Sequence, residues 1–69
     1  MSNFSDLMDY VIIQEENHPE WRQGQTLFNC LNDLQPKLAN SIRGTRTDPF
    51  HVTDINRLDE IMFFISINI

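Results

Sequence analysis

Three prolines divide this chain into short segments and so limit the length of any regular element. Pro19, Pro36 and Pro49 interrupt a chain of 69 residues. Proline lacks a backbone N–H and disfavours helical geometry in the residue before it, so a helix that reaches one of these positions is expected to end or restart there. The sequence therefore predicts a single domain, residues 1–69, built from short elements.

The first segment has the apolar period of a helix over residues 3–16. Its apolar side chains are Phe4, Leu7, Met8, Val11 and Ile12. This spacing places them on one side of a helix of about three turns. Either Ser2 or Asn3 can cap its first turn, because both side chains can accept a backbone N–H.

A second helix is predicted over residues 19–33, with Pro19 in its first turn. Its apolar arc contains Trp21, Gly24, Leu27, Phe28, Cys30, Leu31 and Leu34. Gly24 lies in the middle of this arc, although a glycine inside a helix costs about 0.5–1 kcal/mol relative to alanine. We expect a close neighbour to offset that cost, and the first helix is the expected neighbour.

Two more helices are predicted, over residues 36–42 and 53–66, joined by an exposed loop and a turn at residues 47–50. In that turn Asp48 is expected to accept backbone N–H groups while Phe50 reaches the core. Thr53 is the expected cap of the last helix. Its core stripe consists of Ile55, Leu58, Ile61, Met62 and Ile65. The predicted fold is thus all-α, a small bundle of about four helices, with a short C-terminal strand at 65–69 as the alternative.

Three apolar residues of the last helix fall outside that core stripe: Phe63, Phe64 and Ile67. A chain of this size buries only about 60% of its unfolded surface. It has one cysteine, so an intrachain disulfide cannot stabilise it. We therefore expect a homodimer or larger oligomer, with these three residues at its interface.

The charges are unevenly placed. Residues 1–20 hold five acids and no Lys or Arg, in a chain whose net charge is −5. An acidic chain is a poor nonspecific ligand for nucleic acid or anionic membrane, but suits a protein partner with a basic face. Lys37, Arg43 and Arg46 form a basic segment at 36–47. The alternative function is therefore weak nucleic-acid binding through that segment, in the manner of a helix-turn-helix.

Residues able to support catalysis or metal binding are sparse. Glu15 and His18 have the Glu-x-x-His spacing of helical di-iron sites, but only one copy is present and Pro19 follows it. Cys30 and His51 are a candidate nucleophile and base, yet Cys30 lies in an apolar arc, where an inert buried thiol is usual. We expect no metal, no cofactor and no enzymatic activity.

The chain is also expected to be cytoplasmic. Residues 1–10 contain two Asp and no Lys or Arg, unlike a signal peptide. The longest strongly apolar run, 61–65, is too short to span a bilayer.

Residues 18–29, with the pattern His-Pro-x-Trp-Arg-x-Gly-Gln-x-Leu-Phe-Asn, precede an Asp-Pro-Phe turn at 48–50. With these two motifs the chain resembles a group of small uncharacterised phage and bacterial proteins. The resemblance implies a phage or mobile-element setting, and so a host cytoplasm. A small acidic chain in that setting is expected to be a non-enzymatic accessory or inhibitory factor that binds a protein partner. Arg22 and Gln25, polar residues beside the apolar arc, are its candidate partner contacts.

Overall fold

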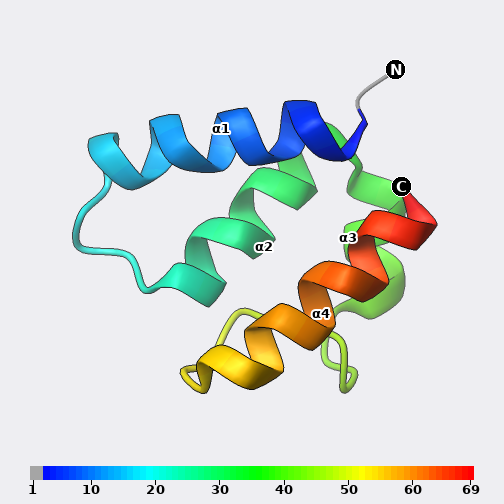
Figure 1. Ribbon diagram of the computed structural model, residues 1–69. Coiled ribbons are helices and arrows are strands. Elements are labelled where there is room, and N and C mark those ends of the chain that lie inside the picture. The colour runs from blue at the N-terminus through cyan, green and yellow to red at the C-terminus, as the bar shows by residue number, and fades with distance from the viewer. Residues whose placement is uncertain (1–2) are drawn as a thin grey trace.

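The protein is an all-α bundle of four helices. A computed structural model describes residues 3–69, with α1 at Phe4–Asn17, α2 at Gln23–Leu34, α3 at Pro36–Ile42 and α4 at Ile55–Asn68. In Figure 1, α1 crosses above α2, and α4 runs along the other side of α2 in front of α3. The predicted fold class is confirmed. Among residues 3–69, no helix has both the length and the apolar character needed to cross a membrane.

The alternative C-terminal strand is wrong, because residues 65–68 continue α4. Two side chains of its last turns donate to helix carbonyls: the Ser66 hydroxyl to the Phe63 oxygen (2.6 Å) and the Asn68 amide to the Phe64 oxygen (2.8 Å). Each side chain reaches a carbonyl three or four residues earlier, a spacing that a helix brings together and an extended strand does not.

Helix α1 begins with a reciprocal cap. The Asp6 N–H donates to Asn3 Oδ1 (2.9 Å), and the Asn3 N–H donates to Asp6 Oδ2 (3.4 Å). This arrangement satisfies one free N–H of the first turn and fixes the chain direction at the helix start. Asn3 is therefore the cap; Ser2, the other expected candidate, lies outside the described residues.

Helix α2 begins at Gln23, four residues later than predicted. The chain first makes a turn in which the Trp21 N–H donates to the His18 carbonyl (3.0 Å) and the two rings stack at 3.8 Å. Pro19 occupies the second position of this turn. The fixed φ of proline suits the second position of a turn as well as the start of a helix. The presence of proline therefore did not show which of these two structures forms here. Trp21 is half-buried and precedes the helix.

Helix α2 is the centre of the core and contributes more of its buried side chains than any other helix. The buried core cluster comprises Leu7, Leu27, Phe28, Cys30, Leu31, Ala39, Ile42, Ile61 and Ile65. The Tyr10 hydroxyl also donates to Asp33 Oδ2 (2.8 Å), which ties α1 to the C-terminal end of α2. Helices α1 and α3 pack closely on α2, and α4 joins the same core through Ile61 and Ile65.

The close neighbour of Gly24 is a loop and not α1. A Cβ at Gly24 would overlap the Pro49 carbonyl oxygen and would lie 3.0 Å from the Val52 carbonyl oxygen. Glycine lets the backbone of the 49–52 turn approach the helix directly. The expectation that α1 covers Gly24 is wrong, because the contact joins residues about 25 positions apart, which helical periodicity does not describe.

The turn lies at residues 49–52, where the Val52 N–H donates to the Pro49 carbonyl (3.0 Å), and not at the predicted 47–50; the predicted roles of Asp48 and Phe50 are confirmed. Gly44 has a positive φ of 74° and ends the α3 region. Asp48 accepts the N–H of Gly44 (2.7 Å) and that of Phe50 (2.9 Å). Phe50 is half-buried, with its ring edge-on to Phe28 at a centroid distance of 6.0 Å. The carboxylate thus holds the turn in the shape that packs against α2.

Helix α4 is capped by Asp54 in place of the predicted Thr53. The Asp54 carboxylate accepts the Asn56 N–H at 3.0 Å, and the helix runs from Ile55. Of the predicted core stripe, Leu58, Ile61 and Ile65 are buried and Met62 is half-buried. Ile55, in the first turn of α4, is 60% exposed.

Replacing Gly24 with alanine should destabilise the protein. The added methyl group meets backbone, which cannot rotate away, and overpacking of this kind typically costs about 1–3 kcal/mol. The free energy of unfolding, from urea denaturation, should fall by about 2 kcal/mol.

Asn32→Ala is the matched control, since Asn32 is exposed on the same helix. It should be neutral or slightly stabilising, because alanine has the higher helix propensity. If Gly24→Ala were also stabilising, the close approach of the 49–52 turn would be contradicted.

Candidate functional site

An apolar groove lies between α1 and α4, with α2 as its floor. It encloses about 260 Å³, more than the roughly 150 Å³ that suffices to hold a benzene molecule inside a protein. We call it the α1/α4 groove. Its lining residues are Met8, Val11, Ile12 and Glu15 of α1, Gln23 and Leu27 of α2, and Ile55, Leu58, Asp59 and Met62 of α4.

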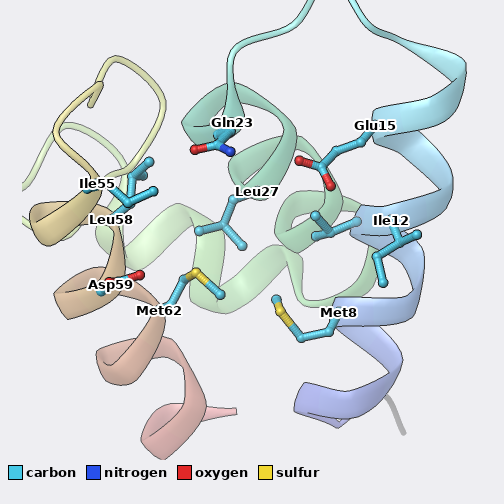
Figure 2. A pocket seen from close by; sticks show the side chains of 10 residues that line it. Met8, Ile12, Glu15, Gln23, Leu27, Ile55, Leu58, Asp59 and Met62 are labelled. Atoms are coloured by element: carbon cyan, nitrogen blue, oxygen red, sulfur yellow. The ribbon is translucent and has the colours of Figure 1, made fainter.

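Figure 2 shows how these side chains are placed. Leu27 rises from α2 at the centre, while Met8 and Met62 extend toward each other from the two walls. Gln23 and Glu15 lie together at one end of the groove. The interior is therefore apolar, and the polar groups stand at its margin.

The groove exists because α1 packs closely on α2, whereas α4 joins the shared core through Ile61 and Ile65 and packs closely on neither of these two helices. Each wall presents about two helical turns, from residues 8 to 15 on α1 and from 55 to 62 on α4. Two apolar side chains at its edges remain largely in solvent: Ile12 is 56% exposed and Ile55 is 60% exposed. A partner seated in the groove would cover both of them.

The two walls carry the whole net charge of the molecule. Helix α1 holds four acids and no base, and α4 holds two acids and one base. That base, Arg57, donates to the carbonyl of Arg46, in the loop before α4. Acids and bases balance over the rest of the chain. The groove is thus an apolar cleft between two acidic walls.

Most of these residues were predicted to lie in the core, and the groove was not predicted. Periodicity shows which side of a helix is apolar, but not whether a neighbour covers that side. One signal was present: at 100° per residue, Glu15 falls inside the apolar arc of α1, between Val11 and Met8. An acid within an apolar arc indicates that this part of the arc meets water.

The three predicted interface residues of α4 do not all lie on one exposed surface. Phe63 and Ile67 are both 67% exposed and follow each other by one turn. Phe64 departs from the expectation: it is half-buried and packs against the core cluster. It follows the buried Ile61 by three residues, so its ring reaches the same edge of the core.

Arg22 and Gln25 lie at the start of α2. Arg22 is exposed, and its Nη2 lies 3.4 Å from His51 Nδ1, which it can approach as a donor when that nitrogen is unprotonated. Gln25 is half-buried. Neither residue lines the α1/α4 groove.

The three cations of the basic segment differ in their surroundings. Lys37 is exposed in the first turn of α3. The Arg43 guanidinium lies 4.9 Å from the centre of the Phe28 ring and donates to Asn40 (3.4 Å). Arg46 is exposed in the loop after α3. Part of the positive charge of this segment is therefore held against the protein's own core.

The remaining chemistry-bearing residues lie apart from the groove or are inert. Cys30 is 1% exposed, and burial raises the pKa of its thiol to about 11, with a smaller contribution from the nearby acids Asp33 and Glu15. His51 is exposed beside Phe50. His18 stacks on Trp21 and lies 3.2 Å from Glu20. Across residues 3–69, no three metal-binding side chains gather as a metal site would require.

Comparison with known protein families, with curated proteins and with solved structures gives no match.

The raised pKa of Cys30 predicts that the folded thiol reacts slowly with alkylating reagents. It also predicts that the protein loses stability as the pH rises in the alkaline range. Between pH 9 and about 11 the unfolded thiol loses its proton while the folded one keeps it, so the free energy of unfolding should fall as the pH rises. At pH 8, alkylation by iodoacetamide should be much slower than in urea-unfolded protein.

Cys30→Ala isolates this effect. Tyr10 also titrates in alkali, with its pKa raised chiefly by the hydrogen bond to Asp33, and the variant retains it. The variant should lose stability less steeply than the wild type between pH 9 and 11. Equal slopes, or rapid alkylation of the folded protein, would contradict the assignment of a buried thiol.

Proposed function

We propose that this protein is a non-enzymatic accessory or inhibitory factor that binds another protein by holding one of its helices in the α1/α4 groove. The observation that carries the proposal is the groove itself, an apolar cleft whose lining comes from α1, α2 and α4. A helix that presents an apolar stripe to such a cleft completes the packing that the bundle leaves open.

The dimensions of the groove support this occupant. Walls of about two turns match two turns of a docked helix, which would insert side chains spaced at i, i+4 and i+7. Met8 and Met62 meet the occupant from either side. Methionine is unbranched and polarisable, so these walls can adapt to side chains of different shape.

The proposal also covers the oligomeric state of the protein and its origin in a phage or mobile element. Phe63 and Ile67 leave a second apolar strip on α4, and its self-association would bury both residues in a homodimer or larger oligomer. We place the protein in the host cytoplasm as a product of a phage or mobile element, on the resemblance carried by residues 18–29 and 48–50.

Oligomer formation is tested by sedimentation velocity. The wild type should sediment as a dimer or larger species, and the Phe63→Ser, Ile67→Ser double variant should shift toward monomer. A wild type that stays monomeric at all concentrations would remove self-association from the proposal.

Groove binding is tested with a synthetic amphipathic peptide of 14 residues, the length of α1 and of α4. Its apolar stripe would be leucine and its remaining positions glutamine and alanine, so that it is uncharged. Calorimetric titration should show binding. Ile12→Ser combined with Ile55→Ser should weaken that binding about tenfold or more, since two apolar side chains are lost from the contact.

Ile13→Ser is the matched control. Ile13 is 53% exposed on the same helix, nearly the same as Ile12, but it does not line the groove. Its substitution should leave the affinity within about twofold, which is below 0.5 kcal/mol. If Ile13→Ser weakened binding as much as the groove variant, or if the peptide failed to bind, the groove would not be the binding site.

A further inference from the structure

We infer that the helix held in the α1/α4 groove is cationic, with an apolar stripe flanked by Lys or Arg on both sides. This inference rests on the proposed function and names the chemistry of its partner. It follows from where the charges of the groove walls lie relative to the apolar lining.

Acids border the groove on each wall. Figure 2 shows Glu15 on α1 and Asp59 on α4 among the lining side chains, with the Glu15 side chain extending from α1 toward α2. At 100° per residue, Asp9 and Glu16 of α1 lie just outside Ile12, and Asp59 of α4 lies just outside Ile55. All four of these acids are exposed. An occupant's flanking residues would therefore meet carboxylates along both edges.

Among residues 3–69, no Lys or Arg side chain lines the groove to offset these acids. Helix α1 has no base, and the guanidinium of Arg57 is bonded to the Arg46 carbonyl. A helix with acidic flanks would bring like charges together across the rim, which costs affinity, whereas Lys or Arg flanks would pair with the rim.

The same charge pattern disfavours a second copy of this chain as the occupant. The exposed apolar residues of α1, Ile12 and Ile13, are accompanied by Asp9, Glu15 and Glu16, and those of α4 by Asp59 and Glu60. Seating either helix in the groove of another copy would place acids against acids. The strip formed by Phe63 and Ile67 remains the surface for self-association.

The test compares three peptides that share one leucine stripe and differ only in their flanks, which are lysine, glutamine or glutamate. At low salt the lysine peptide should bind about tenfold more tightly than the glutamine peptide, and the glutamate peptide more weakly than both. The difference should nearly vanish at 1 M salt, where the Debye length falls to about 3 Å. A lysine peptide with a scrambled stripe should not bind.

Charge-neutral variants locate the effect at the rim. Glu15→Gln with Asp59→Asn should weaken binding of the lysine peptide about fivefold, since exposed charge pairs contribute roughly 0.2–1 kcal/mol each. Binding of the glutamine peptide should stay within about twofold. Asp33→Asn is the control: it removes a charge at the far end of α2, outside the groove lining, while its amide oxygen can still accept from Tyr10.

The outcomes separate the two claims. If all three peptides bind alike, the groove holds a helix but the inference of a cationic partner is overturned. If no peptide binds, the groove function fails and the inference fails with it. If the lysine peptide instead dissociates the oligomer, a second copy occupies the groove and the inference is again overturned.

Discussion

The contact between Gly24 and the turn at 49–52 is the constraint on which the rest of the structure depends. Because Gly24 has no side chain, the Pro49 and Val52 carbonyls lie directly against the start of α2. The edge-on contact of Phe28 with Phe50 and the approach of Arg22 to His51 reinforce it. These contacts join the two motifs, residues 18–29 and 48–50, into one packing unit. They anchor the chain directly before α4 and so set where that helix begins.

This anchoring explains why a groove is left open. Helix α1 is tied to α2 by the shared core and by the Tyr10–Asp33 hydrogen bond, and α4 is positioned from the opposite side by the turn before it. Neither wall helix needs the other for its placement. In the function proposed above, their facing side chains would receive the partner helix, and the unbalanced acids on the same helices would favour a cationic one.

Features set by neighbours in the sequence were predictable. Helical spacing located four helices, Pro36 started α3, and Asp48 closed its turn. Pro19 was misassigned because a turn and a helix start use the same φ. The neighbour of Gly24 and the groove were not predictable in the same way, since both depend on how distant segments meet. Glu15, an acid within an apolar arc, was the one local sign of the groove. That sign can be interpreted only when the position of α4 is known.

The central claim is that an apolar helix occupies the space between α1 and α4. Its most direct test is nuclear magnetic resonance of the complex with the lysine-flanked peptide, using protein labelled at the methionine and isoleucine methyl groups. The account predicts intermolecular nuclear Overhauser effects from the peptide leucines to the methyl groups of Met8 and Met62, and none to those of Ile13. Contacts to Ile13 or Ile67 without contacts to the two methionines would contradict it.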